Sequence, residues 1–276
     1  MKYIAKFYPE RTKKKETEIA QAAKAKGLDG LTVSFINKGK AHFRTNNKPF
    51  SGFSLEKLKQ ELAKEDLELG LVAPFFFNEE IWENYPEKRA KHKDKPWPKT
   101  SWYKPLCPLY PGLFNERLQE LKEAVEVIEP DFVGLDFFPF PLFWEELAEK
   151  RELLSCECSK CEAKEKKTRK AIIQTYAQET KKTLGDIPVM VHLVPFLDKK
   201  TIEITGQDPK LLSKELDALS PMLYSDLLQR DSSFITSTLE ELKEYNLWPS
   251  LEMKKMNQTE LLPDIYEKVL YFYWDV

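Results

Sequence analysis

The chain has 276 residues, of which 42% are hydrophobic and 32% are charged, and its formal net charge is -2. So much apolar sequence can bury a large core, which excludes a disordered chain, and the balanced charge gives no reason to expect a nucleic acid or an anionic membrane as a partner. The sequence contains no run of about 18 apolar residues, so we expect no membrane span.

Short apolar and β-branched runs alternate with longer amphipathic segments along the chain. The predicted strands are residues 3–8, 31–36, 68–76, 132–138, 189–194, 220–224, 248–252 and 270–274. The predicted helices are residues 12–26, 55–63, 114–128, 159–183, 209–216, 238–245 and 260–268. Short, almost continuously apolar strands that are separated by helices are typical of a parallel sheet covered on both faces.

This alternation predicts an α/β protein of the (β/α)8 TIM-barrel class, formed by residues 1–276 as one domain. Because the sequence stops soon after the last predicted strand, we expect the final helix to be absent or shortened. A doubly wound open sheet is the alternative. It is less favoured because no Gly-x-Gly-x-x-Gly turn follows a strand and the chain has only 9 glycines.

Two predicted loops are long, at about 77–113 after the third strand and 139–158 after the fourth. In a barrel both lie on the C-terminal face, where active sites are built. The first residues, MKYIAKFYPE, lack the apolar stretch of a signal peptide, so we expect a cytoplasmic protein. In a reducing compartment, clustered cysteines favour a metal site over disulfides.

All four cysteines lie in or beside these loops, Cys107 in the first and Cys156, Cys158 and Cys161 in the second. The Cys-x-Cys-x-x-Cys spacing lets three thiolates reach one tetrahedral ion, and Cys107 would complete a closed Zn²⁺ site. Such a site is structural because no coordination position stays open. A disulfide from Cys107 and a cluster of free thiols are the alternatives, and His42 or His92 could replace Cys107 as a ligand.

Two acidic residues, Asp136 and Glu252, end apolar strands on opposite sides of the predicted barrel. Asp136 interrupts FVGLDFFPF, and Glu252 follows WPSL. An ionised carboxyl group in an apolar wall is costly unless a partner or a substrate compensates for it. Two carboxyl groups that face each other across a barrel mouth suit glycoside hydrolysis, in which one protonates the leaving oxygen and the other attacks the sugar or activates water. Each could instead be a structural acid.

Aromatic and polar residues around the same mouth are candidates for binding a sugar, because aromatic faces suit the apolar faces of pyranose rings. The candidates are His192, Tyr224, Trp274, Trp144 and Trp102. His192 could equally be a satisfied histidine of the barrel interior. Trp274, at the end of the last strand, is a candidate floor on which a sugar ring stacks.

The segment 107–161 resembles the centre of uncharacterised glycoside-hydrolase-like (β/α)8 barrels. It carries a Cys-Pro motif, a helix, a strand-four Gly-x-Asp-Phe motif at Gly134–Phe137 and then Cys-x-Cys-x-x-Cys. The cysteine arrangement is also similar to the structural zinc cluster of family 42 β-galactosidases, which implies zinc but not galactose. Those galactosidases carry Asn-Glu on strand four, where this chain has Leu135-Asp136. Family 18 chitinases end the corresponding motif with a catalytic Glu, where this chain has Phe138.

We therefore expect a glycoside hydrolase-like enzyme with a carbohydrate substrate and a structural Zn²⁺. The sequence predicts neither a nucleic-acid nor a membrane partner, and it leaves homo-oligomer formation open. The alternative is a non-catalytic carbohydrate-binding or scaffold barrel that keeps the zinc site. A zinc-dependent hydrolase is a third hypothesis, which would require an open coordination position.

Overall fold

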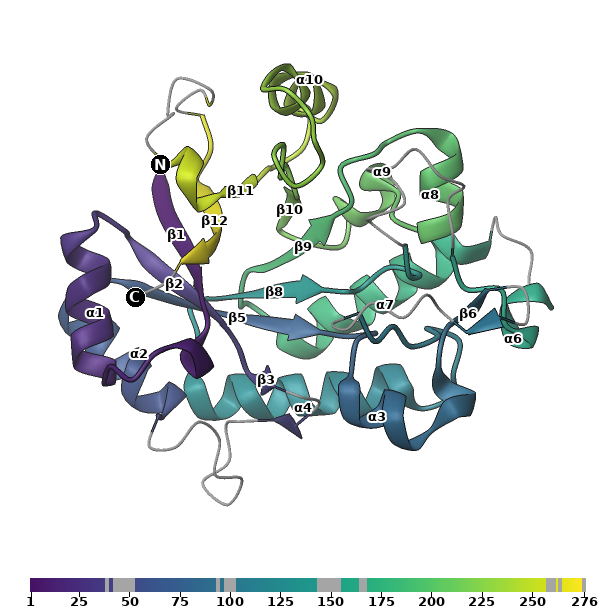
Figure 1. The fold of residues 1–276 in the computed structure, drawn as a ribbon, viewed down its shortest axis with the longest axis horizontal. Coiled ribbons are helices and arrows are strands. Elements are labelled where there is room, and N and C mark those ends of the chain that lie inside the picture. The colour runs from purple at the N-terminus through teal and green to yellow at the C-terminus, as the bar shows by residue number, and fades with distance from the viewer. Residues whose placement is uncertain are drawn as a thin grey trace.

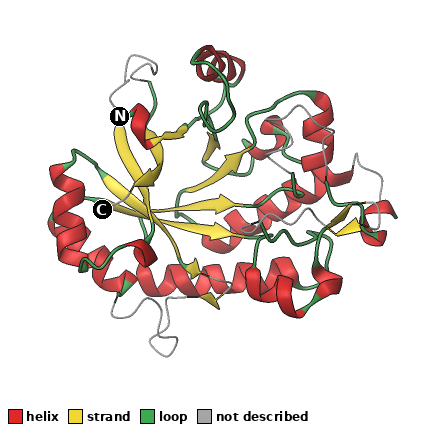
Figure 2. Ribbon diagram, viewed as in Figure 1, coloured by secondary structure: helices red, strands yellow, loops and turns green. Residues whose placement is uncertain are grey.

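The computed structural model describes residues 1–37, 40–41, 53–92, 95–96, 103–142, 155–163, 168–256, 262 and 265–274. Its centre is an eight-stranded parallel sheet with helices packed around it (Figures 1 and 2). In their hydrogen-bonded order the strands are β10 (Ala218–Pro221), β9 (Val189–Leu193), β8 (Phe132–Asp136), β5 (Glu68–Pro74), β2 (Gly30–Ser34), β1 (Lys2–Phe7), β12 (Lys268–Trp274) and β11 (Ser250–Glu252).

The two ends of this series meet, so that the sheet closes into a barrel. Met222, just after β10, forms a parallel bridge with Ser250 of β11, and Leu219 forms another with Leu247. The backbone N–H of Leu223 donates to the carbonyl of Ser250 at 2.8 Å, which continues the ladder across the seam. Neighbours around the ring therefore follow the order of the chain, as repeated β-α-β units require. The predicted (β/α)8 barrel is confirmed.

Helices connect successive strands on the outside of the ring. The α-helices are α1 (Glu16–Ala25), α2 (Leu55–Lys64), α3 (Glu79–Asn84), α4 (Leu113–Ile128), α6 (Ser159–Glu162), α7 (Thr168–Leu184), α8 (Lys199–Thr205), α9 (Pro209–Leu212) and α10 (Ser233–Glu241). Short 3-10 helices are η1 (Pro9–Arg11), η2 (Pro86–Lys88) and η3 (Met253–Lys255). Two small hairpins pair β3 (Ile36–Asn37) with β4 (Lys40–Ala41) and β6 (Lys91–His92) with β7 (Lys95–Pro96).

Several helix predictions differ from the structure. The helix predicted at 209–216 is shorter, the stretch 159–183 contains the two helices α6 and α7, and α3 was not predicted. The helix predicted at 260–268 is wrong, since Lys268 begins β12 and the described residues 262 and 265–267 are not helical. Pro263 in this segment disfavours a helix, because it lacks a backbone N–H and restricts the preceding residue. The helix predicted at 238–245 begins earlier, where Asp231 Oδ1 accepts from the N–H of Ser233 at 3.0 Å. Helix α8 was not predicted. Asp198 begins it by accepting from the N–H of Thr201 at 3.0 Å.

The N-terminal part of the barrel interior is packed with apolar side chains. They are Ile4, Phe132, Met190, Ala218, Trp248 and Leu270. The rings of Phe132 and Trp248 meet edge to face at 5.4 Å between centroids. A Cβ on Gly70 would lie 2.4 Å from the Phe132 ring, so glycine leaves the room that this large side chain fills. Lys268, at the start of β12, lies over the Phe132 and Trp248 rings and pairs with Glu68 at 3.0 Å, and the other polar side chains of the interior lie toward the C-terminal mouth.

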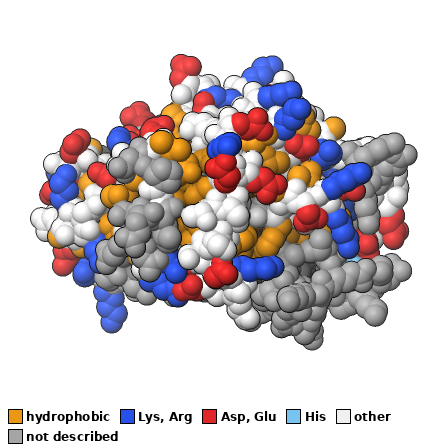
Figure 3. Space-filling view, turned by 90° about the horizontal axis from the view of Figure 1, so that it is seen from above, with side chains coloured by type: hydrophobic (Ala, Val, Ile, Leu, Met, Phe, Trp, Pro, Cys, Tyr) orange, Lys and Arg blue, Asp and Glu red, His pale blue; other side chains and the backbone are white. Residues whose placement is uncertain are grey.

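Charged side chains of both signs lie on one face of the molecule (Figure 3). On the face drawn in Figure 3, lysines and arginines are interspersed with acidic side chains among the described residues. No helix in the described part of the chain combines the length and the apolar character needed to cross a membrane.

Candidate functional site

Asp136, the last residue of β8, lies at the mouth of the barrel in a buried ion pair. Its Oδ2 accepts a hydrogen bond from Nζ of Lys6 on β1 at 3.0 Å. Its Oδ1 accepts from the backbone N–H of Phe137 at 2.9 Å. The side chains of Asp136 and Lys6 are only 12% and 16% exposed. The predicted acid is therefore accompanied by a cation that sequence reasoning did not identify.

The backbone directly after Asp136 adopts a strained conformation. Phe137 has φ +47°, in the left-handed region that bulky residues rarely enter and that costs about 1–3 kcal/mol. The turn directs the Phe137 ring onto Phe77, with centroids 4.6 Å apart, and toward Tyr103 at 6.0 Å. These two rings come from the long loop after β5. The strained turn thus directs two consecutive side chains to different partners. Phe137 packs against the loop after β5, and Asp136 pairs with Lys6.

The ion pair determines the charge state of both groups. Burial alone would raise the pKa of Asp136, but the charge of Lys6 and the two hydrogen bonds hold it below its usual range. Burial alone would lower the pKa of Lys6, but the charge of Asp136 more than compensates, and the pKa is raised. At neutral pH the pair is therefore a carboxylate and an ammonium group.

His192 and Tyr224 lie beside this pair and are uncharged. His192 on β9 is 5% exposed, and burial lowers its pKa to about 4 in spite of the charge of Asp136. Burial raises the pKa of Tyr224, which follows β10, and its hydroxyl lies 3.1 Å from Oγ of Ser250. The Tyr224 ring stacks on Phe272 of β12 at 4.9 Å. Strands from around the barrel thus place a charged pair, a neutral imidazole and a phenol in one mouth.

Glu252, the last residue of β11, has different partners. Its Oε1 accepts from the backbone N–H groups of Asp226 at 3.1 Å and Leu227 at 3.0 Å. The carboxylate therefore fixes the turn that follows β10. The Asp226 side chain in turn forms ion pairs with Lys254 and Lys255. Among the contacts of the described residues none joins Asp136 to Glu252, so the predicted pairing of these two acids stays a prediction.

The remaining predicted sugar-binding residues are tryptophans. Trp274 ends β12, although its side chain is not among those described. Trp102 and Trp144 lie outside the described residues. Lys6 is the residue that sequence reasoning missed. Its signal was present, because a lysine interrupts the apolar strand YIAKFY in the same way that Asp136 interrupts FVGLDFF.

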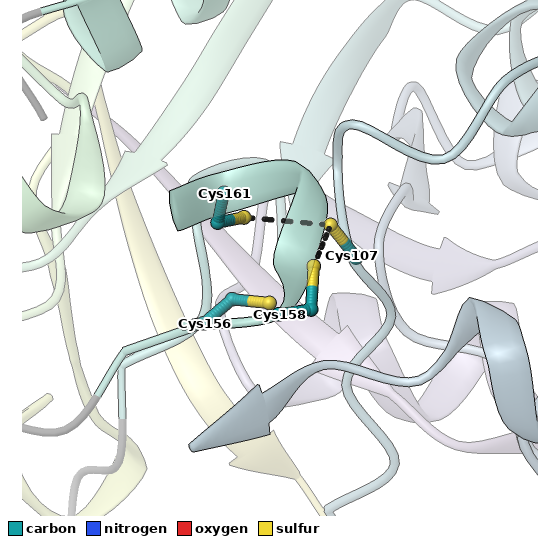
Figure 4. Close-up of side chains that lie close together, drawn as sticks. All are labelled: Cys107, Cys156, Cys158 and Cys161. Atoms are coloured by element: carbon teal, nitrogen blue, oxygen red, sulfur yellow. Dashed lines mark hydrogen bonds between the residues drawn. The ribbon is translucent and has the colours of Figure 1, made fainter. Parts of the chain in front are cut away.

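The four cysteines form one cluster on the rim of the barrel (Figure 4). Their sulfur atoms all lie within 4.8 Å of one another, and Sγ of Cys107 is 3.4 Å from Cys158 and 3.6 Å from Cys161. All four are free cysteines, so no disulfide joins them. Zn–S bonds of about 2.3 Å in a tetrahedron place sulfur atoms about 3.8 Å apart. The donor set and its spacing therefore fit a tetrahedral thiolate site.

The backbone around the cluster is tied to its surroundings by buried polar contacts. Arg169 of α7, 4% exposed, donates to the carbonyl of Cys156 at 2.6 Å and to that of Ile204 at 2.7 Å. Nδ1 of His92 lies 3.2 Å from a carboxylate oxygen of Glu157. His92, considered as a substitute ligand, thus pairs with an acid between two cysteines, while His42 lies outside the described residues. These contacts fix the loop that carries Cys156 and Cys158.

No protein-family model and no curated protein sequence matches the chain. Solved structures match its fold. The glycoside hydrolase domain of PgaB (BpsB) from Bordetella bronchiseptica has a TM-score of 0.70 at 12% identity, over 99% of this chain and 94% of that one. The β-galactosidase from the psychrophilic Marinomonas ef1 has a TM-score of 0.69 at 12% identity, over 99% of this chain and 54% of its own.

A third match is α-L-fucosidase isoenzyme 2 from Paenibacillus thiaminolyticus, with a TM-score of 0.62 at 12% identity, over 91% of this chain and 40% of that one. At such identities the likeness shows the fold alone. This chain therefore has a barrel fold that several glycoside hydrolases share. The expected resemblance to family 42 β-galactosidases is not established by a fold match to one β-galactosidase.

Proposed function

We propose that the protein is a glycoside hydrolase-like enzyme that cleaves a glycosidic bond at the C-terminal mouth of the barrel. The observation that carries this proposal is the buried ion pair of Asp136 and Lys6 beside Tyr224 and Phe272. A desolvated carboxylate at the end of a barrel strand, next to aromatic faces, is suited to a sugar substrate. The fold shared with glycoside hydrolases supports the same function.

In this mechanism Asp136 acts in its ionised form. Because its pKa is lowered, it is a poor proton donor at neutral pH and a suitable nucleophile, general base or stabiliser of the oxocarbenium-like transition state. Lys6 keeps the carboxylate charged and fixes its orientation through Oδ2. We propose Glu252 as the second carboxyl group. It ends β11 at the same mouth, and the amides of Asp226 and Leu227 position its Oε1.

The sugar would be bound by the residues around these carboxylates. His192 and Tyr224 flank Asp136 as uncharged hydrogen-bonding groups. Trp274, Trp144 and Trp102 remain the proposed stacking residues.

We also propose that the cysteine cluster holds a structural Zn²⁺. Cys107, Cys156, Cys158 and Cys161 would be its four ligands, and four thiolates leave no coordination position for a substrate. The ion would join the two long loops and supply no chemistry to the reaction. Purified protein should contain about one zinc per chain by elemental analysis, and a fully folded protein without zinc would disprove this part of the proposal.

A non-catalytic sugar-binding barrel is the second candidate function. One observation favours it, namely that both carboxylates already have partners within the chain. Asp136 pairs with Lys6, and Glu252 accepts hydrogen bonds from two backbone amides. In that case the mouth would bind a glycan without turnover. A glycan array combined with a hydrolysis screen separates the two functions.

Asp136→Asn tests the catalytic proposal. We expect it to abolish hydrolysis of whichever 4-nitrophenyl glycoside the wild-type protein accepts, while thermal unfolding shows a folded barrel. The matched control is Asp186→Asn, which makes the same change at an exposed acid in the turn before β9, away from the mouth. Unchanged turnover in Asp136→Asn would remove Asp136 from the mechanism. Binding of glycans by the wild type without any turnover would favour the second function.

A further inference from the structure

Among the buried polar atoms that have no hydrogen-bond partner in the described part of the chain, two belong to neighbouring strands of the barrel. They are Nδ1 of His192, whose residue is 5% exposed, and Oγ of Ser220, whose residue is fully buried. Leaving a buried polar group unpaired is costly, so nearly all such groups in proteins are satisfied by protein, water or a ligand. Two of them side by side therefore indicate that something binds there.

The two atoms belong to the same face of neighbouring strands. His192 of β9 and Ser220 of β10 are paired in register. Two positions earlier, Met190 and Ala218 point into the barrel interior, and side chains two apart on a strand share a face. His192 and Ser220 therefore face the interior one layer closer to the mouth. The charges of Asp136 and Lys6 both act on His192, so His192 lies near this ion pair, and Ser220 is its register partner on the next strand.

The chemistry of this layer favours an uncharged ligand. Asp136 and Lys6 neutralise each other, and burial keeps His192 neutral at pH 7. Burying a further charge here would be costly, whereas a neutral imidazole and a hydroxyl can each donate or accept a hydrogen bond. The stacked rings of Tyr224 and Phe272 add an aromatic wall. A hydroxyl group on a sugar ring meets all three conditions.

We propose that His192 and Ser220 form the floor of the sugar site and hydrogen-bond one hydroxyl group of a saccharide that is bound beside Asp136. This inference rests on the proposed function, in that it assigns residues to the same mouth. It goes further because it names the group on the ligand that the unpaired atoms recognise. It also assigns a role to Ser220, which no sequence pattern distinguished.

The test measures binding and not turnover. Glucose, galactose, mannose and N-acetylglucosamine are titrated into the wild-type protein and into Ser220→Ala by NMR or calorimetry. For the sugar that binds, we expect Ser220→Ala to weaken the affinity about 5- to 10-fold, which corresponds to one lost hydrogen bond. Ser213→Ala, directly after α9 in the outer layer, makes the same change away from the mouth and should bind like the wild type.

Monodeoxy sugars identify the hydroxyl group. The analogue that lacks the contacted hydroxyl should bind the wild type at least as weakly as the parent sugar binds Ser220→Ala, because it loses the contacts to both residues, and Ser220→Ala should weaken its binding no further. His192→Phe should show the same pattern with the same analogue. Additive losses at every position, unchanged affinity in both variants, or no binding by the wild type would overturn the inference. If a sugar binds in this pattern but its 4-nitrophenyl glycosides are not hydrolysed, the catalytic proposal is refuted and the floor remains.

Discussion

Replacing Lys6 by Met removes the cation of the central ion pair and leaves Asp136 buried. The two charges are 3.0 Å apart, with side chains 16% and 12% exposed. At an effective dielectric constant of about 20, Coulomb's law gives about 5 kcal/mol for this separation, and breaking a buried pair typically costs about 3–5 kcal/mol. We therefore expect Lys6→Met to lower the free energy of unfolding at pH 7 by about 3 kcal/mol.

The stability lost in Lys6→Met should become smaller as the pH falls. The pKa of Asp136 is lowered in the folded protein, so the stabilisation by the ion pair is complete at neutral pH and is lost as the pH falls below the usual carboxyl value of 3.8. In Lys6→Met burial acts on Asp136 without the compensating charge and raises its pKa. As the pH falls from neutral, protonation of Asp136 removes the uncompensated buried charge of the variant. The difference in the free energy of unfolding between the variant and the wild type should therefore shrink between pH 7 and pH 4.

Urea denaturation followed by circular dichroism measures both quantities. Lys2→Met is the matched control, since Lys2 lies on the same strand and pairs with Glu68, but its side chain is 50% exposed. We expect this control to cost less than about 1 kcal/mol at pH 7. Lys6→Arg, which keeps the charge, should recover part of the loss. If Lys6→Met costs no more than Lys2→Met, or if its deficit is the same at pH 4 and pH 7, the buried ion pair is not what stabilises the mouth.

Three further perturbations test the metal site and the barrel interior. Cys107→Ser should leave well below one zinc per chain after dialysis and lower the Tm, and full zinc content would exclude Cys107 as a ligand. Arg169→Met should weaken zinc retention against a competing chelator by about 10- to 100-fold, because it removes the donor to the Cys156 carbonyl, and equal retention would show that this contact does not orient the loop. Gly70→Ala should lower the free energy of unfolding by about 1–3 kcal/mol in urea, since the new Cβ lies 2.4 Å from the Phe132 ring, and a cost near zero would mean that the interior is not close-packed there.

The barrel was predictable because its strands carry a local signal. Strands such as β8 and β9 are buried along their whole length and read as continuous apolar runs between amphipathic helices. The boundaries that differed depend on single contacts, such as the side chain of Asp198 at the start of α8. The cysteine site was predictable for a similar reason, since three of its members are close in sequence and Cys107 lies in the neighbouring loop.

The candidate site was predictable only in part, because its residues meet across the barrel. Asp136 was found because an acid interrupts an apolar strand. Lys6 was not, since β1 and β8 are not adjacent and only the closed ring brings the two side chains to 3.0 Å. Alternation along β11 places Glu252 at the mouth, but its hydrogen bonds to Asp226 and Leu227 depend on the turn after β10, which no pattern in the sequence defines.

The cysteine cluster and Asp136 are connected through the backbone of the loop after β5. The N–H of Phe75 donates to the carbonyl of Asp136 at 2.9 Å, and the N–H of Phe76 donates to that of Phe137 at 3.0 Å. The carbonyl of Phe76 accepts from the N–H of Leu106 at 2.9 Å, directly before Cys107. The strained turn at Phe137 is thus bonded to a strand that continues into the cysteine loop. Strain of this kind persists only where the surroundings fix it, and these hydrogen bonds to the segment 75–76 are among the contacts that hold the turn after Asp136.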